Sequence, residues 1–311
     1  MIKYYKIDNN NHILPTHSTE NAKIINLIAP SYKELEKISK LTNVPIDFLS
    51  AACDKEERPR IESDDDKHLI IIHIPYEEKK TDIPVITIAF AIILTNKYLI
   101  TVSSVNTPFL ENIFKKKLKK QYKNILFAIM CLISIEIADL YLKHIKQIQK
   151  QADEVEKKIH KSMTNEMLIN MLNLEKSLVY FSTALKGNDL IWYKIQRIFN
   201  NKLSEEEKEL IEDVLVEFKQ AHDLTEIHSN ILSGMMDAFA SVISNNLNVV
   251  MKFLTSVTII LMIPTLITSA YGMNVDNIPF ANNPHAFWIV MGFSFFLSFI
   301  GAIIFWRKNL F

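Results

Sequence analysis

One uncharged stretch, residues 253–275, constrains the fold of this chain more than any other feature. It contains no Asp, Glu, Lys or Arg, and a helix needs about 20 mainly apolar residues to cross the hydrocarbon core of a bilayer. A second apolar stretch, 287–306, begins and ends with aromatic residues, which favour the membrane–water interface. Nearly all of the charge lies before residue 253. The sequence therefore predicts a charged body followed by two membrane-spanning helices.

The first span is polar on one side. Polar or methionine residues recur at alternating spacings of three and four, at Asn248, Met251, Thr255, Thr258, Met262, Thr265 and Ser269. This spacing places them along one helix face. Such a stripe is typical of packing between membrane helices, but around the axis of a symmetric bundle it would line a pore. The second span has no comparable stripe, so we expect it to face lipid.

The composition of the body excludes several classes of function. The 311 residues carry 35 basic and 35 acidic side chains, and a nucleic-acid partner would require a basic face. Cys53 and Cys131 are far apart and form neither a disulfide framework nor a zinc spacing. No glycine-rich phosphate loop occurs, so we expect no nucleotide, no organic cofactor and no enzyme activity. The first twelve residues lack the apolar core of a signal peptide, which predicts a cytoplasmic N-terminal domain.

Residues 1–122 are predicted to form a small α/β domain. Runs rich in Ile and Val at 23–29, 68–74 and 84–102 are typical of strands, and the break at 95–97 indicates a hairpin turn. Residues 31–42 and 45–52 have the pattern of short helices. Residues 109–120 follow as a helix with a basic face of lysines.

Long helices are predicted next, over 123–165 and 166–198 within a helical segment that ends at 203. Ser204 and Glu207 have the spacing of a capping box. No proline follows until Pro264, so one helix is expected to run from 204 into the membrane, as a stalk over 204–248 and a span over 249–273. Within a bundle of helices, neighbouring groups can bond the carbonyl that this proline frees.

The basic residues around the spans predict their orientation. Lys252 precedes the first span, and Arg307 and Lys308 follow the second, whereas the loop 274–286 has no Lys or Arg. Because cytoplasmic loops carry the excess of basic residues, we expect the loop outside and both termini, with the tail 307–311, in the cytoplasm.

The end of the first span, Tyr271-Gly272-Met273-Asn274, resembles the CorA family of magnesium and cobalt transporters. Further landmarks of that family occur in the same order, at 59–62 (PRIE), 176–181 (KSLVYF) and 231–234 (ILSG). The specific part of the resemblance is a GMN motif between two spans, after a capped helix.

The resemblance implies a funnel-shaped homopentamer in the cytoplasmic membrane that conducts Mg²⁺, with Co²⁺ and Ni²⁺ as further substrates. The first span would line the pore and the second would form an outer ring. Gly272, Met273 and Asn274 would form the selectivity mouth. The implied inward positions nearly coincide with the stripe, and they add Leu254 as an alternative to Thr255.

The resemblance also implies regulation by intracellular Mg²⁺. Asp213 on the stalk would meet Asp65 or Asp66 of a neighbouring subunit, and Asp237 would be a further acid nearer the membrane. Bound Mg²⁺ would hold the pore shut. The alternative is that Asp64, Asp65 and Asp66 form a solvated acidic turn and that Asp213 is an ordinary acid on a helix surface.

Two other functions stay open from the sequence, a Zn²⁺ transporter of the same architecture and a membrane-anchored oligomeric scaffold or sensor. The loop after the GMN motif departs from the acidic loop of many family members, because Asp276 is its only charge. Asn282 and Asn283 are candidate polar substitutes there.

Overall fold

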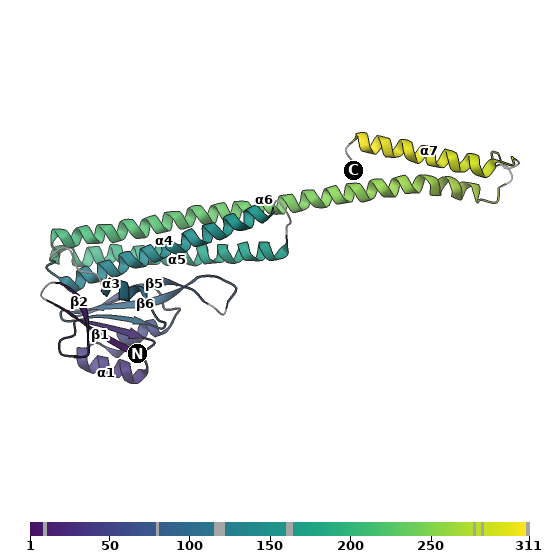
Figure 1. Cartoon of the computed structure of the whole chain (residues 1–311). Coiled ribbons are helices and arrows are strands. Elements are labelled where there is room, and N and C mark those ends of the chain that lie inside the picture. The colour runs from purple at the N-terminus through teal and green to yellow at the C-terminus, as the bar shows by residue number, and fades with distance from the viewer. Residues whose placement is uncertain are drawn as a thin grey trace. The chain divides into compact units, whose positions relative to one another are not determined.

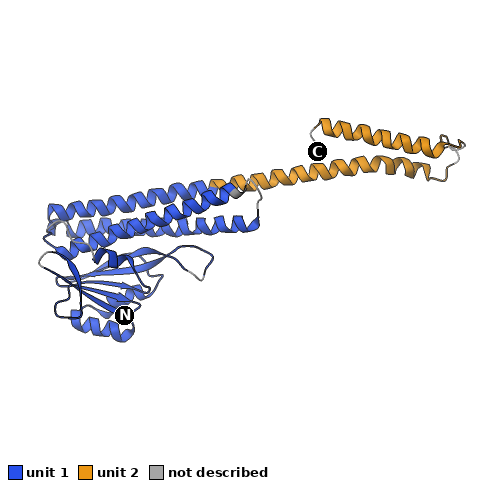
Figure 2. Ribbon diagram, in the orientation of Figure 1, with its two compact units in different colours: residues 1–233 blue, residues 234–311 orange. Residues whose placement is uncertain are grey.

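The computed structural model describes the chain except for residues 9–10, 79–80, 115–121, 160–163, 276–277, 281–282 and 309–311. The chain divides into two compact units, 1–233 and 234–311, which Figure 2 shows in different colours.

Unit 1 is built on a seven-stranded sheet with the order β2-β1-β3-β7-β6-β5-β4 (Figure 1). The pair β3–β7 is parallel, and every other neighbouring pair is antiparallel. The strands are β1 (Ile2–Ile7), β2 (Ile13–Thr16), β3 (Ile24–Ile28), β4 (Arg60–Asp64), β5 (Lys67–Tyr76), β6 (Ile86–Leu94) and β7 (Leu99–Ser103).

The central strands are mainly apolar because both faces of the sheet are covered. All five residues of β3 and all five of β7 are buried. On one face lie α1 (Tyr32–Thr42), α2 (Ile46–Ser50) and the short 3-10 helix η1 (Ala51–Cys53), whose apolar side chains join the sheet in one core. Ser31 and Glu34 begin α1 with a capping box. The two predicted short helices and the predicted hairpin at 95–97 are thereby confirmed.

Helices cover the other face of the sheet (Figure 1). They are α3 (Phe109–Phe114), α4 (Ile125–Ile159) and α5 (Asn165–Phe199), which ends in the 3-10 helix η2 (Asn200–Lys202). The lysines predicted to form a basic helix face, Lys115, Lys116, Lys117, Lys119 and Lys120, lie outside the described residues.

The predicted long helix is observed as α6 (Glu205–Tyr271), 67 residues with Pro264 inside it. Its predicted capping box is half formed. The Glu207 carboxylate accepts a hydrogen bond from the Ser204 amide at 3.0 Å, but the Ser204 hydroxyl is buried without a partner in the described part of the chain. Glu207 also accepts a hydrogen bond from the backbone amide of Asn124, just before α4. One buried carboxylate thus joins the beginnings of two long helices.

Three described helices are long and apolar enough to cross a membrane, α4, α6 and α7 (Ala286–Arg307). The most apolar stretch of α4 is 61% buried within the structure, against 6% for α6 and 11% for α7. The apolar surface of α4 is therefore covered by its own domain, whereas that of α6 and α7 needs another apolar surrounding.

Candidate functional site

The candidate site lies in unit 2, where the end of α6 packs against α7. The Ser298 hydroxyl of α7 lies 3.4 Å from the carbonyl oxygen of Ile260, and a Cβ added to Gly301 would lie 3.4 Å from Cδ1 of Ile263. Further along, Ile267 shares a groove with Val290 and other apolar residues of α7. Residues 260, 263 and 267 are spaced by three and four, so one face of α6 carries the contact with α7.

The polar stripe lies on the opposite face of α6. At about 100° per residue, its average direction is about 150° from that of Ile260, Ile263 and Ile267. All eight candidate pore-lining residues are exposed in this chain, including Met262 at 61% and Leu254 at 57%. They are Asn248, Met251, Leu254, Thr255, Thr258, Met262, Thr265 and Ser269. The structure thus separates a face used by α7 from an unoccupied polar face.

Two threonines of the stripe have their hydroxyl protons bonded within the helix. Thr258 Oγ1 donates to the carbonyl of Leu254 at 2.8 Å, and Thr265 Oγ1 donates to that of Leu261 at 3.0 Å. A hydroxyl that donates inward still has oxygen lone pairs to offer as an acceptor. Those oxygens suit a cation, or water molecules that a cation holds.

The GMN motif closes the last turn of α6. The amide of Gly272 lies 3.0 Å from the carbonyl oxygen of Thr268 and 3.1 Å from that of Ser269. A Cβ added to Gly272 would make ordinary contacts at 3.5 Å with the same two oxygens. Packing within one chain therefore does not require glycine at this position.

Asn274 is exposed, and its carboxamide bonds no other residue that the structure describes. Asn283, a candidate polar ligand of the loop, differs, because its Oδ1 accepts a hydrogen bond from the amide of His285 at 2.9 Å. Asp276 and Asn282 lie outside the described residues. Of these two described loop carboxamides, Asn274 is therefore the one whose oxygen accepts no hydrogen bond from a described residue.

The second span has a polar face that the sequence reading missed. Ser294 and Ser298 are buried, at 0% and 9% exposure, and with Gly301 they lie on the side of α7 that meets α6. Their spacing of four and three was the available signal. The expectation that α7 has no such stripe is corrected: small residues of this kind let helices approach closely.

Two of the candidate regulatory acids form a hairpin turn. Asp65 and Asp66 join β4 to β5, and Asp65 has a positive φ of 52°, which Asp tolerates better than most residues. Asp66 accepts a hydrogen bond from Asn96 at 2.9 Å. With Lys202 they line a hollow of about 280 Å³. Burial lowers the pKa of the neighbouring His68, Lys202 lowers it further, and Asp66 opposes this.

The other two candidate acids lie on α6. Asp213 and Asp237 are exposed, and no hydrogen bond or ion pair joins either to another described residue. Within the described part of one chain, no group of three or more His, Cys, Asp or Glu side chains could hold a metal ion. The four acids are therefore not brought together as a metal site by a single chain.

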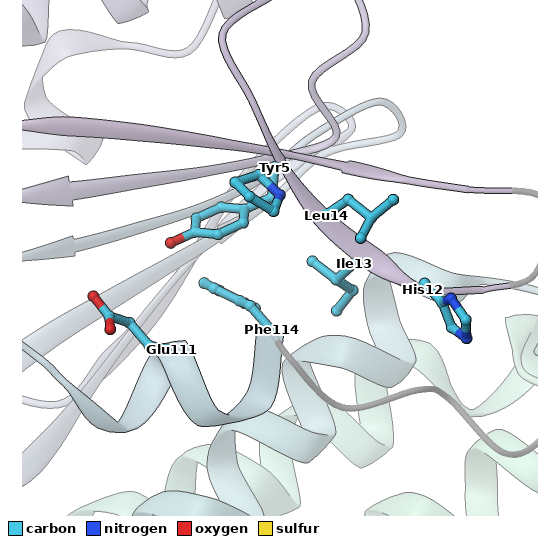
Figure 3. A pocket seen from close by; sticks show the side chains of 7 residues that line it. Tyr5, His12, Ile13, Leu14, Glu111 and Phe114 are labelled. Atoms are coloured by element: carbon cyan, nitrogen blue, oxygen red, sulfur yellow. The ribbon is translucent and has the colours of Figure 1, made fainter.

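A different hollow, of about 410 Å³, lies between α3 and the β1–β2 hairpin (Figure 3). Tyr5, Ile13 and Phe114 give it a mainly apolar wall. Its carboxylate, Glu111, is 2.6 Å from the ammonium of Lys3 and raises the pKa of that group by their hydrogen bond. This hollow therefore has an ion pair at its edge.

Comparisons with known proteins agree with this architecture. Residues 20–308 match the family model described as CorA-like Mg²⁺ transporter protein. The cobalt/magnesium transport protein CorA of Methanocaldococcus jannaschii is 30% identical over 285 residues, which cover 90% of this chain and 88% of that protein.

Solved structures show the same fold. The complete CorA magnesium transporter of M. jannaschii superposes with a TM-score of 0.86 at 27% identity, over 100% of this chain and 99% of that one. The cytoplasmic domain of ZntB from Vibrio parahaemolyticus has a TM-score of 0.59 at 13% identity, over 78% and 96% of the two chains, which shows the fold alone. The chain described here belongs to the CorA-like family of divalent cation transporters.

Proposed function

We propose that this chain forms a passive channel for divalent cations, with Mg²⁺ as the main substrate and Co²⁺ and Ni²⁺ as further ones. The observation that carries the proposal is the polar stripe of α6, exposed on the face opposite α7 and ending beside the free carboxamide of Asn274. In a symmetric assembly of copies, this face would surround an axis while α7 lies outside it.

The stripe suits a cation that keeps its water. Mg²⁺ demands octahedral oxygen coordination and usually retains several waters in protein sites. Carboxamide oxygens at Asn274 and Asn248, and the hydroxyl oxygens at Thr258 and Thr265, can accept hydrogen bonds from those waters. The stripe contains no carboxylate, and a fixed charge in the membrane would be costly. Met251, Leu254 and Met262 would form apolar constrictions that close by dewetting.

In a mouth formed by several chains, Gly272 would lie close to neighbouring copies or to the ion. Within one chain there is room for a side chain at this position. We take the assembly to be a pentamer from the resemblance to the family.

The same proposal gives the arrangement in the membrane. Residues 1–122 and 123–203, with the stalk 204–248, would lie in the cytoplasm. The spans 249–273 and 287–306 would cross the cytoplasmic membrane, with 274–286 outside and 307–311 inside. An inside-negative potential would then favour entry by about 2.3 kcal/mol per charge for each 100 mV.

Regulation would come from Mg²⁺ bound between subunits. Asp213 and Asp237 are exposed and have no partner among the described residues of one chain, so they could meet acids of a neighbour, such as Asp65 or Asp66. Bound Mg²⁺ would neutralise these carboxylates, and its loss would leave like charges that repel and loosen the assembly.

The test is ion flux into liposomes that contain the purified protein, with a voltage imposed. Mg²⁺, Co²⁺, Ni²⁺ and Zn²⁺ are offered in turn to the wild type, to Asn274→Ala and to the control Asn283→Ala, whose carboxamide oxygen is already bonded to His285. We expect Mg²⁺ entry in the wild type and the control, and its loss in Asn274→Ala with the oligomer still assembled.

Three other outcomes would change the proposed substrate, function or selectivity mouth. Entry of Zn²⁺ without Mg²⁺ would keep the pore but replace the substrate. No flux of any ion from a correctly inserted oligomer would favour a membrane-anchored scaffold. Undiminished flux in Asn274→Ala would remove the GMN motif from the selectivity mouth.

A further inference from the structure

We propose that Ser298 is a positioning residue for the pore-lining helix, because its hydroxyl bonds the one backbone carbonyl that Pro264 leaves without a helical partner. The bond itself is a property of the hairpin of α6 and α7. Its consequence for transport rests on the proposed function.

Pro264 creates the need for this bond. In an α-helix the carbonyl of residue 260 accepts a hydrogen bond from the amide of residue 264. Proline has no amide hydrogen, and its ring pushes against the carbonyl four residues earlier. The Ile260 carbonyl is thereby freed inside a stretch that we place in the membrane, where no bulk water can satisfy it.

Ser298 supplies a donor from the other helix. Its Oγ lies 3.4 Å from the carbonyl oxygen of Ile260 and 3.1 Å from that of Ser294, one turn earlier in α7. The hydroxyl has a single proton, which is therefore shared between an oxygen of its own helix and an oxygen of α6. The side chain is 9% exposed, so little solvent competes for that proton.

The helices are close at this point for a steric reason as well. Gly301 follows Ser298 by three residues, and a Cβ there would lie 3.4 Å from Cδ1 of Ile263. Ile260 and Ile263 flank Met262 of the stripe along α6. A change in the Ile260–Ser298 bond would therefore alter the helix between two candidate pore-lining residues, Thr258 and Thr265.

The contact has a matched control in the neighbouring turn. Ser294 is also fully buried, but its hydroxyl has no hydrogen-bond partner in the described part of the chain. Ser294→Ala thus removes a buried hydroxyl that makes no bond to α6. Ser298→Ala removes the bond, and Ser298→Thr retains a hydroxyl.

A double-mutant cycle with Pro264→Ala isolates the bond. An alanine at 264 restores the amide that pairs with the Ile260 carbonyl, so the Ser298 hydroxyl has nothing left to supply. We would measure amide hydrogen exchange of residues 261–263 and 265–268 in the full-length protein in lipid nanodiscs, and Mg²⁺ uptake into liposomes by the same variants.

We expect Ser298→Ala to accelerate exchange in this segment about threefold, the effect of a typical hydrogen bond between membrane helices, and to change the rate of Mg²⁺ uptake. Ser298→Thr and Ser294→Ala should behave as the wild type. In the Pro264→Ala background, Ser298→Ala should change neither measurement.

If Ser298→Ala accelerates exchange equally in both backgrounds, its effect comes from packing and the proposal is overturned. The proposal is also overturned if Ser298→Ala leaves exchange unchanged in both backgrounds. The exchange readout does not depend on transport. If the wild type passes no Mg²⁺, the proposed function fails, but hydrogen exchange in the double-mutant cycle still tests whether Ser298 bonds the Ile260 carbonyl.

Discussion

Asn188 joins the helical layer of unit 1 to its sheet through both polar atoms of one side chain. It is fully buried in α5, where its Oδ1 accepts from the amide of His73 and its Nδ2 donates to the carbonyl of His73, each at 2.8 Å. The hydroxyl of Tyr141 donates to that same carbonyl at 3.0 Å. The side chain therefore acts as a hydrogen-bonding partner for one residue of β5.

We predict that Asn188→Ala lowers the free energy of unfolding by about 2–4 kcal/mol, because it leaves buried backbone groups of His73 unpaired or weakened. Chemical denaturation followed by circular dichroism would measure this. Asn170→Ala, an exposed position on the same helix, should change the free energy by less than about 0.5 kcal/mol. Equal effects of the two changes would contradict this account of Asn188.

We expect the buried His144 to make the stability of unit 1 sensitive to acid. Burial lowers the pKa of His144, which lies beside Glu77 at 3.9 Å and Gln147 at 3.0 Å, and these two raise it in part. The folded state therefore binds fewer protons than the unfolded state near the ordinary histidine pKa of about 6.5. The contribution of neutral His144 to the free energy of unfolding is therefore complete above that pH. It is lost as the pH falls from there towards the pKa of His144 in the folded state.

We therefore predict that the melting temperature falls as the pH drops from neutral through about 6.5, and that His144→Gln makes this fall smaller. The remaining slope would come from His68 and His73, whose pKa values burial also lowers. Thermal unfolding of both proteins across this pH range measures the difference. An unchanged slope in His144→Gln would assign the acid sensitivity to other groups.

At the scale of elements, Glu207 links α4 and α6 at their first turns. Its carboxylate is 0% exposed and accepts hydrogen bonds from the backbone amides of Ser204 and Asn124. A negative charge at the beginning of a helix also interacts favourably with the helix dipole.

We predict that Glu207→Ala destabilises unit 1 by about 2–4 kcal/mol, since two buried amides lose a charged acceptor. Glu205→Ala is the control, because Glu205 is exposed and pairs only with Lys208 among described residues, at 2.7 Å. That change should cost about 0.5 kcal/mol or less. Denaturation of both variants would compare their free energies of unfolding. A control as damaging as Glu207→Ala would assign the effect to negative charge in the first turn of α6 rather than to the two hydrogen bonds of Glu207.

The sequence predicted helices and the stripe well because their signals are local. A period of 3.6 residues suffices to place Thr258 and Thr265 on one face. The sequence reading missed β1, β2 and β4. Two of these strands, β1 and β4, carry charged residues such as Lys3 and Arg60, which interrupt the apolar pattern of a strand. Both edges of the sheet are among the missed strands, and their pairing depends on neighbours rather than on their own composition.

Contacts between distant residues were beyond prediction. Asn188 and His73 are 115 residues apart, and Ser298 and Ile260 are 38 apart. The capping-box pattern predicted that Glu207 reaches back to Ser204, but nothing local indicates the amide of Asn124. The proline at 264 predicted that a neighbour must bond the freed carbonyl, and the structure supplies Ser298 as that neighbour.

At the scale of the whole molecule, the proposed regulation by Mg²⁺ would need more than one chain. Asp213 has no partner among the described residues of its own chain. If Mg²⁺ joins Asp213 to a neighbour, added Mg²⁺ should protect the cytoplasmic domain of the wild type from protease.

We predict that Asp213→Lys raises the Mg²⁺ concentration needed for this protection. The change would replace a proposed carboxylate ligand with a positively charged side chain, which repels Mg²⁺. Glu212→Lys makes the same change of charge one residue earlier on α6 and should leave the curve unchanged. Limited proteolysis over a Mg²⁺ titration compares the three proteins. Coincident curves for all three would remove Asp213 from the regulatory site.

The central claim is that the stripe of α6 faces water in the assembled protein while the opposite face is covered by α7. Reaction of single cysteines with a charged, water-soluble thiol reagent tests it most directly, because such a reagent reacts with thiolates in water. Cys53 and Cys131 are first replaced, and a cysteine is then placed at Met262, Ile263, Thr265 or Ile267 in the full-length protein in liposomes. The account predicts reaction at 262 and 265 with block of Mg²⁺ entry, and no reaction at 263 and 267. Reaction at 263 and 267 with protection at 262 and 265 would contradict it.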